Sequence, residues 1–443
     1  MSTISTITIA SQATMPQSQA IPRSCRSYPG TESNQYASEH TPPRTCGPSL
    51  VDGPSQPDIE WNPSYQTFLE RVERLAASAA DRPTSLPDGF LPSIDAPRVW
   101  TGSDFEDSTK YVLEFSAKDI KEIERGLAYF KGLPGDLGPD DVSKETFPLP
   151  HLKATLQDVA HSLHLGHGFV VLRGLNPEKY SSLDNVFLYL GITSYVAETR
   201  GAQDYDGRMI VHVKDMEHNL PGGATRQSPY SSRAQPFHTD RCDILSMYAL
   251  DIGATGGESL LASSGKVYNE IAATRPDIIH LLTNDNWVFD EFVTPPKWYT
   301  APLLIPFGPS GPSFSFSRRP LTGAPSCPHT PGIPPMTEEQ AEALDTVHFT
   351  AQKHQLCIPL QRGDIQILNN LALFHARRGF VDDDVRKRHL LRLWLRNEEM
   401  AWEIPAVLVG QAREVYGREG LDAEPKWDVN QTPPAGMHHM RCS

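Results

Sequence analysis

The segment QPFHTDRCDILSMYAL (235–250) contains a histidine and an aspartate two positions apart, His238 and Asp240. On a β-strand, residues i and i+2 point to the same face, so an imidazole and a carboxylate would lie side by side. Such a mixed nitrogen and oxygen pair suits Fe(II), Mn(II) or Zn(II). An HxD pair is also expected by chance in a chain with 16 histidines. Because two ligands are too few for a stable site, a third must come from elsewhere.

His375, in NNLALFHARRGF (369–380), is the best candidate for the third ligand because it ends an apolar strand and is followed by arginines. Two histidines and one carboxylate on one face of a metal leave the opposite face open. Non-haem Fe(II) oxygenases use this arrangement, since a co-substrate and O2 must bind to the same iron. Taken alone, His375 would be interpreted as a surface histidine at the end of a strand.

Arginines recur at every fourth position of RHLLRLWLR (388–396), where Arg388, Arg392 and Arg396 would share one face of a strand. In one interpretation the leucines of the other face are buried and the arginines lie in water. In the other, the arginine face turns into a barrel, where a guanidinium pairs with a carboxylate. Periodicity does not choose between them. The position just downstream of His375 favours the second, because a dicarboxylate co-substrate would need an anchor there.

The elements that must position these residues are helices followed by many short strands. Two helices begin with capping boxes, Ser116 with Asp119 and Thr337 with Gln340. Helices are predicted within 61–80, 115–133, 151–175, 256–282 and 337–354. Strands are predicted at 169–172, 244–250, 363–375 and 388–396, with a short one before the helix in 256–282. This order indicates a mixed α/β chain with a mainly β core, an antiparallel sandwich or jelly roll with helices packed outside.

Composition divides the chain into parts. Residues 1–60 are rich in Ser, Thr, Pro and Gln, and we expect a disordered tail there. A helix and a proline-rich linker are expected at 61–99, the compact domain at 100–405, and a C-terminal tail at 406–443. A proline-rich segment at 305–335 lies inside the domain, and such a segment is often functional, for example as a lid.

The net charge and the cysteines exclude several classes of protein. The chain has 443 residues and a formal net charge of −14, so no nucleic-acid partner is expected. No stretch approaches about 18 consecutive apolar residues, so no membrane span is expected. The six cysteines form no CxxC, which favours free thiols in a reducing compartment. We expect a cytoplasmic protein, with organelle import as the alternative because no acidic residue precedes Glu32.

Four stretches together resemble the taurine dioxygenase-like (TauD/TfdA) group of Fe(II)- and 2-oxoglutarate-dependent oxygenases, in particular its fungal members. They are the HTD of FHTDRCDI, GGESLLASS (256–264), NNLALFHAR and RHLLRLWLR, in the order that the group has. The resemblance extends over about 100–405. It implies a double-stranded β-helix, which is a cupin-like jelly roll, with flanking helices. It also implies Fe(II), 2-oxoglutarate as co-substrate, and O2.

The resemblance assigns roles by position. His238, Asp240 and His375 would be the iron ligands, and no catalytic residue is implied beyond the iron centre. Arg388 would bind the distal carboxylate of 2-oxoglutarate. Ser259 falls where the group often has a threonine that helps to bind the same carboxylate. Arg392 falls where the taurine enzymes have an arginine that faces the acidic group of the substrate. In this chain, Arg392 would therefore bind either the substrate or the co-substrate.

The substrate is not identified by the resemblance. Ala234 occupies a position where we would expect a polar, substrate-facing asparagine in the taurine enzymes, which argues against taurine. Arg392, with Arg318 or Arg319 on the proline-rich segment, hints at a small acidic molecule. Hydroxylation with release of succinate and CO2 is the expected reaction, and desaturation or ring closure would be other outcomes. The oligomeric state is not readable from the sequence.

Two other classes of protein are alternatives. A zinc-dependent hydrolase would use the same three ligands with an activated water, but it would have no use for an anchoring arginine at 388. A non-catalytic jelly-roll binding module would carry His238 and Asp240 merely as polar strand residues. Metal content and dependence on O2 distinguish these classes from an oxygenase.

Overall fold

The computed structural model describes residues 56–77, 82–216, 228–292, 295–306, 311–324, 327–417 and 424–430. All of them fall within one compact unit that spans Cys46–Ser443. Nearly all of the tail expected at 1–60 lies outside the described residues, and the limits of the other expected parts stay predictions. None of the described helices is long and apolar enough to cross a membrane.

Two β-sheets form the centre of the fold. The larger has seven strands in the order β1-β2-β16-β6-β19-β3, with β4 also paired to β19, and the smaller has the order β15-β8-β17-β5. All these pairs are antiparallel except β1 with β2. The large sheet contains β1 (Val112–Glu114), β2 (Phe169–Arg173), β3 (Thr199–Gly201), β4 (Val211–Val213), β6 (Ile244–Asp251), β16 (Ile365–Asn369) and β19 (His389–Arg396). The small sheet contains β5 (Gln235–His238), β8 (Ser259–Ser263), β15 (Leu356–Ile358) and β17 (Leu373–Arg377).

The two sheets face each other across a shared apolar core. Phe169, Leu245 and Trp394 of the large sheet belong to the same buried cluster as Leu261 and Leu373 of the small sheet. Because side chains alternate along a strand, the neighbouring residues Ile367 and Leu393 face outward instead. This arrangement confirms the predicted jelly roll with a mainly β core.

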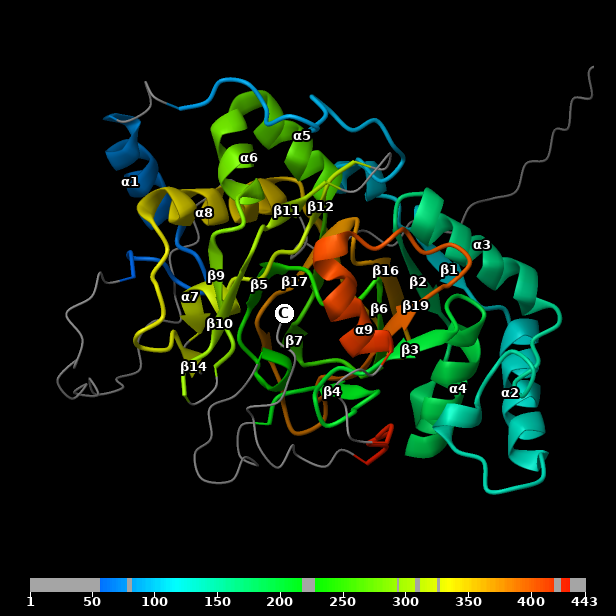
Figure 1. Cartoon of the computed structure of the whole chain (residues 1–443). Helices are drawn as coiled ribbons and strands as arrows, with labels where there is room; N and C mark the ends of the chain where they lie inside the picture. The colour runs from blue at the N-terminus through cyan, green and yellow to red at the C-terminus, as the bar shows by residue number, and fades with distance from the viewer. Residues whose placement is uncertain are drawn as a thin grey trace, which may run out of the picture. The chain divides into compact units, whose positions relative to one another are not determined.

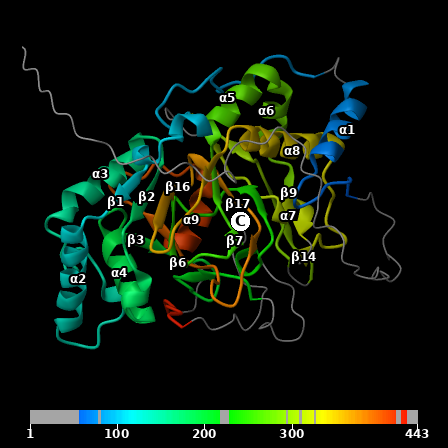
Figure 2. The same cartoon turned by 180° about the vertical axis from the view of Figure 1, so that it is seen from behind.

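Helices cover the outer faces of both sheets, and they lie in two groups on opposite sides of the strands (Figure 1; Figure 2). The first group packs against Ile367 and Leu393 of the large sheet. The second packs against Phe237 and Phe374 of the small sheet. The first group is α2 (Ala117–Gly132), α3 (Leu152–Leu165) and α4 (Ser182–Ser194). The second is α5 (Ser264–Thr274), α6 (Pro276–Thr283) and α8 (Glu338–Lys353).

Local sequence signals explain where several helices begin. The capping boxes of Ser116 with Asp119 and of Thr337 with Gln340 are both formed. The prediction of a single helix within 256–282 is wrong, because the chain forms two helices there, α5 and α6. Proline has no backbone N–H and is favoured in the first turn of a helix, so Pro276 starts a new helix instead of continuing the old one.

The strand predicted at 363–375 is also two elements. Residues 365–369 form β16 in the large sheet, and 373–377 form β17 in the small sheet. The chain crosses between the sheets at Asn370, whose side-chain amide donates to the carbonyls of Asp240 and Cys242 and accepts from the N–H of Asp240. This crossing brings β17 beside β5.

The described part of the proline-rich segment packs into the core instead of forming a free loop. Phe314, Phe316 and Leu321 are buried in the cluster under α5 and α8. The short elements here are β11 (Leu304–Ile305), β12 (Ser313–Phe314), α7 (Arg319–Thr322), β13 (Gly323–Ala324) and β14 (Cys327–Pro328). The role of a lid is therefore not supported for these residues.

Two terminal helices pack on the domain. In α9, Val415 is buried, and the hydroxyl of Tyr416 donates to the carbonyl of Leu395 and accepts from the N–H of Asp243. In α1, Arg71 is buried and pairs with a carboxylate of α8. The remaining helices and strands are α1 (Tyr65–Leu75), β7 (Thr255–Gly256), β9 (Trp287–Asp290), β10 (Trp298–Ala301), β18 (Phe380–Val381) and α9 (Val409–Tyr416).

Candidate metal centre

The fold brings His238, Asp240 and His375 together at one buried point. One ligand atom of each lies within 4.8 Å of the others. The Nε2 atoms of His238 and His375 are 3.7 and 4.0 Å from Oδ1 of Asp240. The local structure differs from the expected one, since His238 ends β5, Asp240 lies in the loop before β6, and His375 is in the middle of β17.

A β-bulge in β5 aims the histidine at the centre. His375 pairs with His238, whereas Arg377 pairs with Gln235, so β5 has one more residue than β17 over this interval. A bulge of this kind redirects side chains and is common next to active sites. As a result, Gln235 and His238 both line the interior, with Gln235 Nε2 only 3.0 Å from His238 Nε2.

The protonation of His238 suits a metal ligand. Its Nδ1 is 2.9 Å from the carbonyl of Pro236, and the N–H on Nδ1 donates to that oxygen. This bond leaves the lone pair on Nε2, the atom that faces Asp240. Burial lowers the pKa of His238, and it lowers the pKa of His375 to well below the usual range. Both rings are therefore neutral, as metal binding requires.

The two oxygens of Asp240 have different environments. Oδ2 accepts hydrogen bonds from the indole N–H of Trp394 at 2.9 Å and from Arg392 at 3.2 Å. Oδ1 is the oxygen that faces the two histidines. Two neutral imidazoles and one carboxylate oxygen directed at a common point are the donor set of the non-haem Fe(II) oxygenases. The residues present therefore fit the metal.

Arg392 is brought to the centre, but its contacts differ from the expected ones. Its Nη1 donates to Asp240, and its Nε donates to Oε1 of Gln203 at 2.8 Å. The side-chain amide of Gln203 in turn donates to the carbonyls of Met209 and Arg392. These bonds hold the arginine against a ligand of the candidate metal centre.

An open cavity lies against the two histidines. Ser259, Arg388 and Arg392 line it, so five of the six residues expected to bind metal or co-substrate lie on its wall, and Asp240 lies directly behind. The hydroxyl of Ser259 donates to Oε1 of Gln366 at 2.8 Å. The other lining residues are Val213, Pro229, Gln235, Leu245, Met247, Leu360, Ala376 and Arg377.

Arg388 reaches the cavity as a buried cation. Its guanidinium carbon lies 5.2 Å from the centre of the Phe380 ring. Its Nη1 has no hydrogen-bond partner among the described residues. Burial and the nearby Arg377 lower the pKa of its guanidinium. Gly257 has φ +79°, and a Cβ there would lie 3.0 Å from Cδ and Nε of Arg388, so glycine makes room for this side chain.

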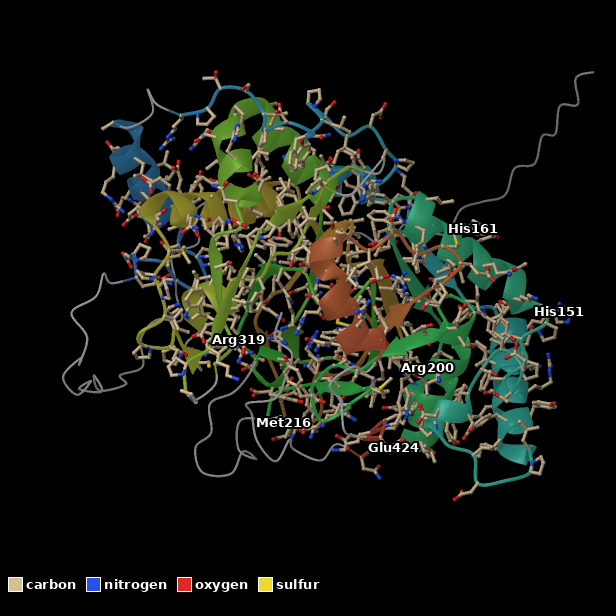
Figure 3. The ribbon with its side chains drawn as sticks, viewed as in Figure 1. His151, His161, Arg200, Met216, Arg319 and Glu424 are labelled. Carbon is tan, nitrogen blue, oxygen red and sulfur yellow. The ribbon has the colours of Figure 1, made fainter. Side chains whose placement is uncertain are left out.

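The two arginines of the proline-rich segment do not line this cavity. Arg318 is buried, pairs with Asp345 at 2.8 Å, and donates to the carbonyls of Glu60 and Trp61. The guanidinium of Arg319, which is labelled beside α7 in Figure 3, lies 5.0 Å from the centre of the Phe292 ring. The expectation that Arg318 binds substrate is therefore corrected, because its charge is used between α1, α7 and α8.

Several residues at the centre are not predicted from the sequence. Trp394 could have been predicted to lie there, because it follows Arg392 by two positions on the same face of a strand. No sequence pattern indicates the other three residues, Gln203, Gln235 and Asn370. Glutamine and asparagine are common, and the partners of these residues are not marked by any motif. The histidines of α3 lie elsewhere, and Figure 3 shows His161 on the outer side of that helix.

Comparison with known proteins agrees with this geometry. The family model described as "Taurine catabolism dioxygenase TauD, TfdA family" matches residues 116–394. The taurine hydroxylase-like protein SAT17 of Stachybotrys chartarum is 36% identical over 343 residues, which cover 76% of this chain and 88% of that protein. An asparagine oxygenase, crystallised with Fe(II), 2S,3S-3-hydroxyasparagine and succinate, shares the fold with a TM-score of 0.50 and 16% identity over 65% of this chain and 93% of that chain. The chain therefore belongs to the TauD/TfdA family and is an Fe(II)- and 2-oxoglutarate-dependent dioxygenase, as the four stretches indicated.

Proposed function

We propose that the protein hydroxylates a small organic molecule at the cavity beside His238 and His375, with these two residues and Asp240 as the iron ligands. The observation that carries this proposal is the buried two-histidine, one-carboxylate set with its ligand atoms within 4.8 Å of one another. When bound, iron and 2-oxoglutarate supply the oxidising chemistry, in which O2 is consumed and succinate, CO2 and oxidised substrate are released.

The chain's own residues orient the reactants and exclude water. Trp394 and Arg392 hold Oδ2 of Asp240, which leaves Oδ1 for the metal. Arg388 binds the distal carboxylate of 2-oxoglutarate, and Ser259 adds a hydroxyl beside it. A buried guanidinium without a protein partner is costly, and a carboxylate partner offsets that cost.

The substrate is a small molecule, but its charge is not assigned. From the sequence, Arg392 and Arg318 hint at an acidic substrate. In the structure, Arg392 is engaged by Asp240 and Gln203, and Arg318 is engaged by Asp345. These two arginines therefore give no support for an acidic group on the substrate.

A hydrolase is less consistent with the cavity. A metal-dependent hydrolase needs a general base near the activated water. Among the described residues, those that line the cavity include no carboxylate. The cavity instead contains a buried arginine, Arg388, whose Nη1 lacks a partner among the described residues.

The test combines metal and co-substrate binding with turnover. Purified protein is titrated with Fe(II) without O2 and then with 2-oxoglutarate, and succinate is measured by mass spectrometry after O2 and a substrate panel are added. We expect stoichiometric metal, 2-oxoglutarate binding and succinate release. Asp240→Ala should lose all three, whereas the exposed Asp384→Ala should keep them. No 2-oxoglutarate binding by the wild type, together with unchanged metal binding in Asp240→Ala, would refute the proposal.

A further inference from the structure

Three arginines line the cavity: Arg377, Arg388 and Arg392. The third is committed to Asp240 and Gln203. The other two are almost completely buried and carry donors that no described residue accepts. These donors are Nε and Nη1 of Arg377 and Nη1 of Arg388.

Arg377 and Arg388 converge at the same end of the cavity. Their guanidinium carbons lie 5.0 and 5.2 Å from the centre of one ring, that of Phe380. Arg377 follows His375 by two positions on β17, so both side chains point into the barrel. Its partner across the ladder to β8 is Ser259, which also lines the cavity. Two cations and one hydroxyl therefore surround this end.

Within the described parts of the chain, neither guanidinium group forms an ion pair with a carboxylate. The backbone N–H of Arg388 donates to Asp382, and the charges of Asp382 and Asp215 raise the pKa of Arg388 and of Arg377, respectively, against the larger effect of burial. Because two buried like charges repel each other and each has lost its hydration, an anion bound between them would stabilise the arrangement. A carboxylate has two oxygens and can accept from both arginines.

From this geometry we infer that Arg377 binds the distal carboxylate of 2-oxoglutarate together with Arg388 and Ser259. The inference rests on the proposed function, and it adds a second guanidinium to the single anchor at Arg388. The inference predicts that the cavity selects its co-substrate by the distal carboxylate. The site should strongly prefer a 2-oxo dicarboxylate to a 2-oxo monocarboxylate of the same chain length, because the monocarboxylate leaves both guanidinium groups buried without a bound anion.

Arg377 also has a structural contact that an experiment must separate from this role. Its Nη2 donates to the carbonyl of Ser231 at 2.6 Å and to that of Arg233. These bonds tie β17 to the segment that leads into β5 and His238. Loss of this tie alone would weaken every ligand of the cavity, whereas loss of a carboxylate contact weakens only ligands that have a distal carboxylate.

The experiment measures binding instead of turnover. Mn(II)-loaded protein is titrated calorimetrically with 2-oxoglutarate and with 2-oxopentanoate, which has the same chain length without the distal carboxylate. Arg377→Gln should bind 2-oxoglutarate roughly 10- to 100-fold more weakly than the wild type, the effect of one charge-assisted hydrogen-bonded contact. Its affinity for 2-oxopentanoate should stay the same or rise. Arg378→Gln, which removes the adjacent charge outside the cavity lining, should change neither affinity.

A second variant and the wild type complete the test. Arg377→Lys retains a cation but not the fork of donors, so it should have an intermediate affinity for 2-oxoglutarate even if Arg377→Gln does not fold. Equal weakening of both acids in the variants, or no weakening of either, would overturn the inference while leaving the proposed function intact. Failure of the wild type to bind 2-oxoglutarate would instead overturn the proposed function.

Discussion

At the scale of single residues, the surroundings of Asp240 decide which of its oxygens is offered to a metal. The indole N–H of Trp394 and the guanidinium of Arg392 both donate to Oδ2. Groups that orient a ligand in this way commonly change metal affinity by about 10- to 100-fold when they are removed. Trp394 is therefore functional through one nitrogen atom, although the rest of its ring belongs to the core.

Trp394→Phe isolates this contribution. The substitution keeps an aromatic ring in the core between the sheets and removes the N–H that holds Oδ2. We expect Mn(II) or Fe(II) to bind roughly 10- to 100-fold more weakly, because the carboxylate can then rotate. Calorimetric metal titration under anaerobic conditions measures this change.

The matched control is Trp298→Phe, since Trp298 is 45% exposed on β10. It should bind the metal as the wild type does. Unchanged metal affinity in Trp394→Phe, with a folded protein by circular dichroism, would show that Arg392 alone holds the carboxylate.

At the scale of elements, one buried carboxylate joins three segments. Asp345 of α8 pairs with Arg71 of α1 at 2.7 Å and with Arg318, just before α7, at 2.8 Å. Both arginine side chains are fully buried. Removing one partner of such a network leaves uncompensated buried groups, which is costly even where the intact network adds little stability.

Arg318→Met tests whether this arginine is structural. We expect the free energy of unfolding to fall by about 3 kcal/mol, the lower end for a broken buried pair, because Asp345 keeps Arg71. Affinity for 2-oxoglutarate should stay within about twofold of the wild type, since Arg318 does not line the cavity. Urea unfolding and calorimetry measure the two quantities.

The control for this prediction lies on α1. Arg74 pairs with Glu338 at 3.3 Å, and its side chain is 53% exposed. Arg74→Met should change the unfolding free energy by at most about 1 kcal/mol, as exposed pairs do. A stable Arg318→Met variant with weakened binding of 2-oxoglutarate would contradict the prediction and would indicate that Arg318 contributes to ligand binding.

At the scale of the whole molecule, burial keeps several histidines neutral. It lowers the pKa of His164, His212 and His348, and it lowers the pKa of His389 to about 3. In the unfolded chain these rings have a pKa of about 6.5. Below that pH the unfolded state binds more protons than the folded state, so the free energy of unfolding falls as the pH falls. Asp243 acts in the opposite direction, because burial raises its pKa to about 6 and the folded state then holds the extra proton.

The metal-free protein should therefore lose stability between pH 7.5 and about 5, because buried histidines with a lowered pKa outnumber the two carboxyl groups, Asp243 and Asp382, whose pKa is raised by burial. Each histidine contributes up to about 1.4 kcal/mol per pH unit once the pH is below the pKa of the unfolded chain. Urea unfolding at constant ionic strength measures the slope. His161→Gln, at an exposed position of α3, should leave the slope unchanged. A free energy of unfolding that is constant or rises toward pH 5 would contradict the prediction.

Much of the candidate site could be predicted from local sequence. The spacing of His238 and Asp240, the histidine at 375 and the arginines of 388–396 were visible as residue types at fixed intervals. Helix caps were predictable for the same reason, since a cap involves residues three positions apart. The bulge in β5 and the crossing at Asn370 were not visible, because each depends on how one strand pairs with a strand more than 100 residues away.

The alternation of β19 shows where sequence information ends. Its period of two correctly assigned Leu391, Leu393 and Leu395 to one face and the arginines to the other, but the choice between water and the barrel interior depended on what covers each face. In the structure both faces are covered, since Leu391 and Leu393 pack under the helices of the large sheet while Arg388 and Arg392 line the cavity. Residue types and their spacing thus determined the chemistry that the chain carries, because ligand sets and strand periods are local properties. Only the tertiary structure decided which arginines are available to a ligand, because a guanidinium is free or committed according to carboxylates that lie far away in the sequence.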